Sequence, residues 1–368
     1  MRTLRRLIYG EVIQSVAFVT LGFLALFFFF DFVEEVKSVG RHYAAGYRLI
    51  HALVYVSLMI PSHLYELMPI AVLIGTIYVM SRLAQSSEYT ILRTSGLDPW
   101  RALKTLLTLG LAFVAFTFAI GDYISPLADR NAQLLKARYT GRITVGQTGA
   151  WLKEKQTYGQ FAVNVGELGS EGKLKGVRIF EFDNRGLLRS MMLAESASLA
   201  ESDAWELHQV QRTEFPSHVE PEAQVERAKL DTLHWPNHIS AEMVSAALLK
   251  PERMSTYDLF QYIQHLQNNA QTAQRYEIEF WKKVFYPLSC LVMVVLALPF
   301  AYLHFRSGSI TTYVFGGVMA GISFFLLNNV FGYMGNLQNW QPWLTAALPG
   351  LIYSFISLTA FGWLVLRR

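Results

Sequence analysis

The chain has 368 residues, of which 52% are hydrophobic and only 16% are charged, and its mean hydropathy is +0.25. Soluble domains carry about 25% charged residues, so this composition excludes an ordinary soluble protein and a disordered one. It is also too polar for a chain that lies wholly in lipid. We therefore expect membrane-spanning helices together with one sizeable segment in water. A net charge of +4 is more typical of basic cytoplasmic loops than of nucleic-acid binding.

Six apolar runs are long enough to cross a bilayer as helices, which takes about 20 residues each. The first run is too long for a cleaved signal peptide, and Asp31 follows where a small-residue cleavage site is expected, so we predict that it is retained. The second run contains prolines at 61 and 69, and the sixth contains one at 349; packed spans tolerate prolines. The six runs cover residues 12–30, 61–80, 103–124, 284–303, 310–334 and 343–366.

Cations in the short loops predict the orientation of the spans. With the N-terminus inside, the short outer loops hold only Lys37, Arg41 and Arg48. Both termini are therefore predicted to be cytoplasmic, and the long insert between the third and fourth spans is predicted to lie outside. The inner segments hold Arg2, Arg5, Arg6, Arg82, Arg93, Arg101, Lys104, Arg306, Arg367 and Arg368.

The insert has a different hydropathy pattern, with a period of two and frequent turn residues between residues 149 and 234. Short strands at regular spacing favour an antiparallel sandwich, roll or half-open barrel. Helical stems are predicted at 127–140 and 256–267. The predicted strands are 150–154, 160–165, 177–182, 187–193, 204–211 and 224–230.

The predicted organisation is thus three spans, an inserted domain and three more spans. The boundaries are residues 1–125, 126–281 and 282–368, and the all-β core of the insert covers about residues 145–235.

A short cytoplasmic helix is predicted between the second and third spans, at about residues 87–95. Gly96 suits the left-handed residue that ends a helix, and Asp98 followed by proline suits the start of the next one. A helix this short is marginal unless it docks on something. It lies either on lipid or in the groove of a partner protein, and its polar residues favour the partner. One face carries Glu88, Ile91, Leu92 and Ser95.

Nucleotide, metal and hydrolytic motifs are weak. Residues 166–174 resemble a phosphate-binding loop, but the spacing is one residue too long and Leu174 replaces the hydroxyl residue, so we interpret the stretch as a hairpin turn. Cys290 is the single cysteine, which excludes an intramolecular disulfide and a cysteine-based zinc site. His234 and His238 are spaced by four residues, but Pro236 between them disfavours a helix. We therefore predict no catalytic residue and no metal site, and any ATP must be bound by another chain.

Two further groups of residues have both a structural and a functional interpretation. Phe27 and Phe30 on the first span, with Gly317, Gly321 and Asn328 on the fifth, indicate either helix packing or a gate beside a cavity. Cations just beyond the first and third spans form either a solvated face or contacts with lipid phosphates. These cations are Lys37, Arg41, Lys136 and Arg138.

Four stretches of the chain resemble the LptF/LptG lipopolysaccharide export permeases, and more closely the LptG member of that pair. The resemblance covers essentially the whole length. It is carried by Phe-Val-Glu-Glu-Val-Lys-Ser-Val-Gly at 32–40, Ala-Gln-Ser-Ser-Glu-Tyr-Thr-Ile-Leu-Arg-Thr-Ser-Gly at 84–96, Gly-Gln-Thr-Gly-Ala-Trp-Leu-Lys at 146–153 and Arg-Tyr-Glu-Ile-Glu-Phe-Trp-Lys-Lys-Val-Phe-Tyr-Pro-Leu-Ser at 275–289.

This resemblance implies a permease subunit of an ABC transporter in the inner membrane of a Gram-negative bacterium, with a periplasmic, jellyroll-like β domain. It implies a sister permease like LptF, a cytoplasmic ATPase dimer like LptB and a single-span partner like LptC beside the first span. ATP and Mg²⁺ would be bound by the ATPase, which would dock on the helix at 87–95, with Glu88 as its acidic contact. Arg93 and Gly96 belong to the same coupling motif.

Two other classes stay open at this point. A membrane-embedded enzyme acting on lipid-linked saccharides would need converging acids near the outer interface, and a scaffold would have no substrate. The only candidate acids for the enzyme are Asp31, Glu34, Glu35 and Asp122.

Overall fold

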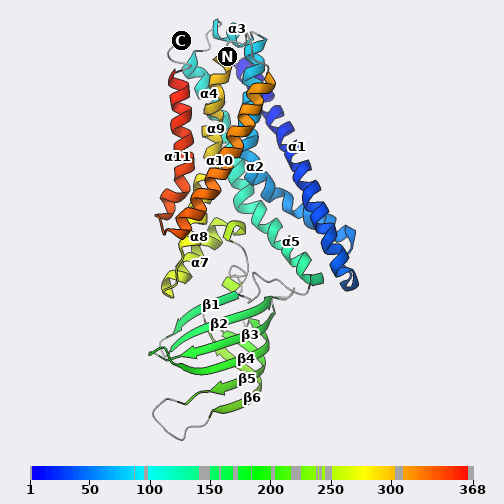
Figure 1. The fold of residues 1–368 in the computed structure, drawn as a ribbon, viewed down its shortest axis with the longest axis vertical. Coiled ribbons are helices and arrows are strands. Elements are labelled where there is room, and N and C mark those ends of the chain that lie inside the picture. The colour runs from blue at the N-terminus through cyan, green and yellow to red at the C-terminus, as the bar shows by residue number, and fades with distance from the viewer. Residues whose placement is uncertain are drawn as a thin grey trace. The chain divides into compact units, whose positions relative to one another are not determined.

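The computed structural model describes residues 2–86, 88–94, 98–140, 150–156, 159–168, 173–183, 185–199, 204–216, 225–237, 239, 243–244, 251–302 and 310–363. Helices form both ends of the chain, and six strands lie between them in sequence (Figure 1). By their internal contacts the residues divide into two compact units. The first comprises 1–35, 56–128 and 277–368, and the second comprises 36–55 and 129–276.

Five helical segments of the described chain are long and apolar enough to cross a membrane, and a bent pair provides a sixth candidate. The bent pair consists of α8 (Gln274–Phe285) and α9 (Ser289–Ala297), and α9 is directly continued by η4 (Leu298–Tyr302). The angle between the two members of the pair is 46°. The five are α1 (Arg2–His42), α2 (Leu49–Gln85), α4 (Pro99–Ala119) continued by η2 (Ile120–Ile124) and α5 (Ser125–Thr140), α10 (Ile310–Leu337) and α11 (Pro342–Phe361).

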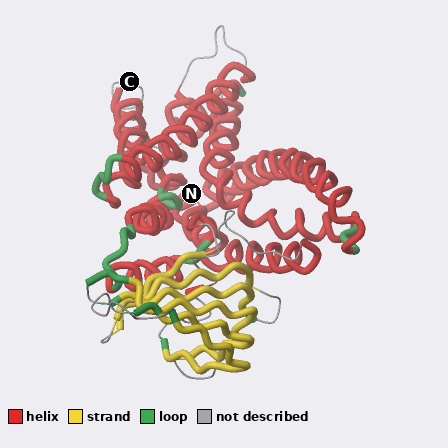
Figure 2. Tube along the Cα trace, turned by 60° about the horizontal axis from the view of Figure 1, so that its bottom comes forward, coloured by secondary structure: helices red, strands yellow, loops and turns green. Residues whose placement is uncertain are grey.

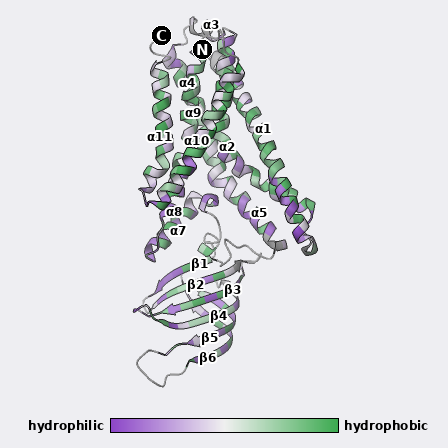
Figure 3. Ribbon diagram, in the orientation of Figure 1, coloured by the Kyte–Doolittle hydropathy of each residue, from purple (hydrophilic) through white to green (hydrophobic). Residues whose placement is uncertain are grey.

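The predicted helical bundle with an inserted β domain is confirmed, but several helices are longer than their apolar runs. The helix α1 continues to His42, and α2 begins at Leu49, twelve residues before the predicted start. Hydrophilic residues gather at the far end of α1 and on α5 (Figure 3), whereas the added start of α2, residues 49–60, is largely apolar. A helix continues as long as its backbone hydrogen bonds are made, whereas an apolar run ends where the hydrocarbon of the membrane ends. Hydropathy alone therefore underestimates the length of helices that extend beyond the membrane.

The start of α1 packs tightly against α2. Ile8, Val12 and Val16 on α1 are all buried. A Cβ atom built on Gly75 of α2 would lie 2.8 Å from the backbone nitrogen of Val16, so the two helix backbones approach as closely as a glycine allows. Beyond Thr20, the same helix exposes large apolar side chains, including Leu21, Phe29 and Phe30.

The six predicted strands are confirmed and form one antiparallel sheet in chain order. Figure 2 shows that this sheet is curved. Among the described strands every pairing joins sequence neighbours, so the sheet is a meander. The strands are β1 (Ala150–Gln156), β2 (Gly159–Leu168), β3 (Leu174–Phe182), β4 (Leu188–Leu199), β5 (Ala204–Glu214) and β6 (Glu226–Pro236).

The turns fit the hairpin interpretation. β2 and β3 pair from Gln160 with Phe182 to Leu168 with Leu174, so the glycine-rich stretch between them joins adjacent strands rather than a strand and a helix. At the next turn, the Asp183 carboxylate accepts backbone N–H bonds from Leu187 at 2.9 Å and from Arg185 at 2.8 Å, which lowers the pKa of Asp183. Gly186 supplies the positive φ of 81° that this turn needs.

Two buried rows of apolar side chains cross the sheet. The register places Leu152, Val163, Ile179 and Met192 opposite one another on β1 to β4. The neighbouring row is equally buried on five strands but ends at Leu230 of β6, which is 37% exposed. The buried members of that row are Ala150, Val165, Val177, Ala194 and Val210.

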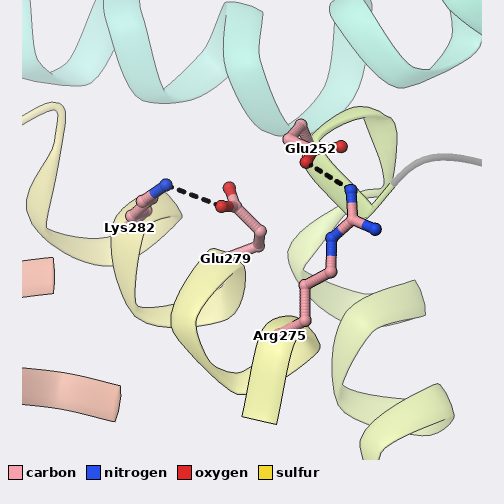
Figure 4. A network of polar contacts seen from close by, with 4 residues as sticks. All are labelled: Glu252, Arg275, Glu279 and Lys282. Atoms are coloured by element: carbon pink, nitrogen blue, oxygen red, sulfur yellow. Dashed lines mark hydrogen bonds and ion pairs between the residues drawn. The ribbon is translucent and has the colours of Figure 1, made fainter. Parts of the chain in front are cut away.

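The helix α7 (Thr256–Asn268) belongs to the second unit and is attached to the sheet. Ser255 and Asp258 form a capping box at its start. At its end, Asn269 accepts a hydrogen bond from the backbone N–H of Lys155 on β1 at 2.8 Å. Arg275 forms an ion pair with Glu252 at 2.9 Å in the same unit (Figure 4).

The glycine at the α1–α2 contact provides a test of this packing. We expect Gly75→Ala to lower the melting temperature of the purified protein in detergent, because the added Cβ would push α1 away from α2 along its buried start. Gly22→Ala is the matched control, since nothing lies within 4 Å of a Cβ at that position. Thermal unfolding followed by tryptophan fluorescence measures both variants. Equal melting temperatures for the two would contradict the close packing.

Candidate transport and coupling sites

The predicted short helix between the second and third spans is present as α3 (Glu88–Thr94). Of the predicted face, Glu88 is exposed and so is Ile91, at 62% of its surface. The start of α4 also follows the prediction, because the Asp98 carboxylate accepts a bond from the Trp100 N–H at 3.3 Å. Of the other predicted coupling residues, Gly96 and the side chains of Leu92 and Arg93 lie outside the described residues.

The side chain that holds α3 in place was not predicted from the sequence. Tyr89 is 3% exposed, and its hydroxyl donates a hydrogen bond to the hydroxyl of Tyr302 at 3.0 Å. The two rings meet edge to face, with their centroids 5.1 Å apart. Tyr302 is the last residue of η4, so α3 is attached to the fourth candidate span. The sequence shows a tyrosine next to Glu88, but the residue pattern of a seven-residue helix is too short to show which of its faces is buried.

Other polar contacts fix the neighbouring end of α1. Glu11 on α1 forms an ion pair with Arg82 on α2 at 2.6 Å. The Tyr9 hydroxyl donates to the backbone oxygen of Thr105 on α4 at 3.2 Å. The start of α1 lies at the same end of the first unit as α3 (Figure 1).

The predicted lipid-binding cations lie in the second unit. Lys37 and Arg41 are both exposed, one turn apart near the end of α1, and Arg41 Nε donates to the Lys37 carbonyl at 3.5 Å. Lys136 on α5 lies with its Nζ 4.6 Å from the centre of the Tyr55 ring, which is a cation–π contact. The side chain of Arg138 lies outside the described residues.

An aromatic cluster supports the end of α5 that carries Lys136. Tyr139 and His51 stack with their centroids 4.4 Å apart, and the Tyr139 hydroxyl is 3.0 Å from His51 Nε2. The Arg48 N–H donates to His51 Nδ1 at 3.1 Å, so in the neutral ring Nε2 is the nitrogen that carries the proton. Tyr47 is fully buried beside both rings.

The five predicted gate or packing residues lie on α1 and α10. Phe27 stacks on the His63 ring at 5.0 Å, and His63 Nε2 is 2.6 Å from an oxygen of Asp31, so this phenylalanine takes part in an α1–α2 contact. Phe30 is 60% exposed, and Asn328 is half-buried on α10.

The two predicted glycines of α10 lie against α2. A Cβ on Gly317 would meet Ile77, and one on Gly321 would meet Ile70, both within 3 Å. This close approach fits the helix-packing interpretation of these glycines.

A buried lysine, which was not predicted from the sequence, joins two irregular points of the helical unit. Lys283 on α8 is 7% exposed, and its Nζ donates to the Gly121 carbonyl at 2.8 Å. Gly121 lies in η2, a π-helical turn, and such turns leave carbonyls that need a partner. Lys283 thus connects the π turn of one span to the bent pair α8–α9.

The neighbouring lysine on α8 is also mostly buried. Lys282 forms an ion pair with Glu279 at 2.7 Å, and the two side chains are 16% and 14% exposed (Figure 4). Its ammonium packs against Gly332 of α10, where a Cβ would lie 2.5 Å from Nζ. The sequence shows two adjacent lysines in the stretch 275–289. Their burial depends on which helices surround them, and the sequence alone does not give this.

Among the described residues, no group of three or more histidine, cysteine, aspartate or glutamate side chains is placed to hold a metal ion. Of the acids that an enzyme would need, Asp31 is engaged with His63, Glu35 is buried and Glu34 is exposed.

Comparisons with known proteins agree with the fold and cover nearly the whole chain. The sequence model of the family described as "Lipopolysaccharide export system permease LptF/LptG" matches residues 6–366. The lipopolysaccharide export system permease protein LptG of Escherichia coli K12 is 26% identical over 363 residues, which is 98% of this chain and 97% of that protein. LptG of Haemophilus influenzae is 26% identical over 369 residues, covering 100% of this chain and 99% of that protein. The chain therefore belongs to the LptF/LptG family of lipopolysaccharide export permeases.

Proposed function

We propose that this chain is the permease subunit of an ATP-driven exporter that takes lipopolysaccharide from the outer leaflet of the inner membrane of a Gram-negative bacterium. The permease passes the lipid to a periplasmic bridge that leads to the outer membrane. Family membership over residues 6–366 is the observation that carries this proposal. ATP and Mg²⁺ are bound by a partner ATPase, and this chain hydrolyses nothing itself.

The proposed orientation places α3 and both chain ends in the cytoplasm. In the first unit, α3 lies at the same end as the start of α1 and the end of α11 (Figure 1). The excess of arginine in the segments at that end supports the assignment, because cytoplasmic loops of membrane proteins are rich in cations. The β domain is then periplasmic.

The proposed contact for the ATPase is the exposed face of α3. Glu88 offers a carboxylate and Ile91 an apolar side chain on a helix that is anchored from the other side by Tyr89. A short helix with one anchored face and one open face suits docking into a groove of a partner.

The proposed first contact of the lipid is with cations near the ends of α1 and α5. Lys37 and Arg41 are exposed donors, and charge-assisted hydrogen bonds to phosphate are among the stronger polar contacts. Lys136 and Arg138 are the further candidates, and the Tyr55 ring and the Tyr139–His51 contact hold the part of α5 that carries Lys136.

The acyl chains require a route that excludes water. Each buried CH₂ contributes about 0.8 kcal/mol, so exposing one chain of a dozen carbons costs roughly 10 kcal/mol. Free release of a lipid with several chains is therefore implausible. The apolar rows of the sheet are themselves buried, so the candidate surface is the exposed end of one row, Leu230 at the β6 edge.

The proposed complex includes a sister permease like LptF and a single-span partner like LptC. The outer half of α1 supports this arrangement, because it presents apolar side chains that this chain does not cover. Leu21 is 67% exposed, and Phe29 and Phe30 are 59% and 60% exposed. Such a face suits lipid tails or another span in the membrane.

The docking of the ATPase is tested by reversing one charge. We expect Glu88→Lys to reduce the ATPase that co-purifies with the permeases by about tenfold, because the variant places a cation where the partner's groove receives an acid. Glu195→Lys on β4 is the control, since it makes the same change at an exposed strand position. Quantitative mass spectrometry of the purified complex measures both. An undisturbed complex with normal ATP hydrolysis in Glu88→Lys would reject the docking role.

The lipid contact is tested in the assembled complex. We expect Lys37→Glu to leave assembly intact but to lower the lipopolysaccharide that co-purifies by about tenfold, because a charge-assisted bond contributes about 1.5 to 3 kcal/mol. Lys175→Glu, at an exposed position of β3, is the matched control. Bound lipid is measured after extraction, together with lipid-stimulated ATP hydrolysis. Wild-type values of both in Lys37→Glu would remove this residue from the site.

A further inference from the structure

The attachment of α3 departs from what its place in the chain suggests. In sequence, α3 connects α2 to α4, so its motion would be expected to pass to those two spans. Its buried side chain, however, also joins a more distant element. Tyr89 instead meets Tyr302, 213 residues further along the chain.

Tyr302 lies at a point from which a displacement reaches several helices. It ends η4, which directly continues α9, and it is itself 6% exposed. The helix α9 packs against both α4 and α11. At its other end, α9 is separated from α8 by the bend that contains Pro287. A movement of the end of η4 is therefore shared by the fourth candidate span and its neighbours.

The geometry of the contact is suited to transmit motion in both directions. An edge-to-face ring pair resists compression because the rings are in contact, and a hydroxyl bond resists separation. The Tyr89–Tyr302 pair has both, with centroids 5.1 Å apart and oxygens 3.0 Å apart. In contrast, the opposite face of α3, with Glu88 and Ile91, is free of such contacts to the rest of the described chain and open to a partner.

We infer that Tyr89 is a positioning residue that couples α3 to the fourth span through the Tyr302 hydroxyl, so that movement of a partner on the exposed face of α3 reaches α9. This inference rests on the proposed function, in which α3 is the contact of the ATPase. Glu88 and Ile91 bind the partner, and Tyr89 passes the displacement on. Loss of the hydroxyl bond then separates ATP hydrolysis from lipid movement without removing the ATPase.

The experiment uses the complete complex in proteoliposomes with the variants Tyr89→Phe, Tyr302→Phe and the double variant. Phenylalanine keeps the ring contact and removes the hydroxyl bond. We expect the ATPase to remain bound and its basal hydrolysis to be unchanged, while the lipopolysaccharide moved per ATP falls about threefold, a change typical of the loss of one buried hydrogen bond. The double variant is expected to equal the single variants, because all three lack the same bond.

Tyr333→Phe on α10 is the control, since Tyr333 is 68% exposed. A merely structural role of Tyr89 would lower thermal stability and reduce hydrolysis and transport together, leaving lipid moved per ATP unchanged. That result, or additive effects of the two single variants, would overturn the inference. Failure of the ATPase to co-purify with the wild-type permeases would instead reject the proposed function, so the two failures are distinguishable.

Discussion

The constraint on which the rest of this structure depends is the cost of placing hydrocarbon in water. At about 0.8 kcal/mol for each CH₂, neither the chain's own spans nor the acyl chains of a lipid cargo can be left in an aqueous space. The composition reflects this constraint in two ways. Six candidate spans carry continuous apolar runs, whereas the strands of the inserted sheet carry alternating ones that gather apolar side chains into buried rows.

Polar contacts within the helical unit occur where the helices are irregular or where they must be held in register. Lys283 satisfies the carbonyl of a π turn, His63 engages Asp31 between α1 and α2, and Tyr89 joins α3 to η4. Each of these contacts links segments far apart in the chain. Because unpaired polar groups are expensive in a membrane, such contacts specify which helices meet and at which level.

The sequence predicts the local features of this fold well, because spans and strands leave periodic signals in short windows. All six strands were expected, and so were the apolar spans, the short helix near Glu88 and the cap at Asp98. Features that depend on contacts between residues distant in the chain were not predicted. The burial of Tyr89 and Lys283, the π turn at Gly121 and the grouping of residues 36–55 with the insert all arise from tertiary contacts. The meander order of the strands was also not predicted, because the alternation of apolar and polar residues within a strand does not specify which strands pair.

A sheltered apolar route for the lipid is the central claim, and neighbouring residues of β6 test it most directly. Leu230 ends a row of buried apolar side chains and is partly exposed, whereas Lys229 pairs with Gln211 and belongs to the other face of the strand. A photo-crosslinking residue is placed at either position in the complete complex. The account predicts an ATP-dependent lipopolysaccharide adduct at position 230 and little at position 229. Equal adducts at both positions, or none at position 230 during ATP hydrolysis, would contradict it.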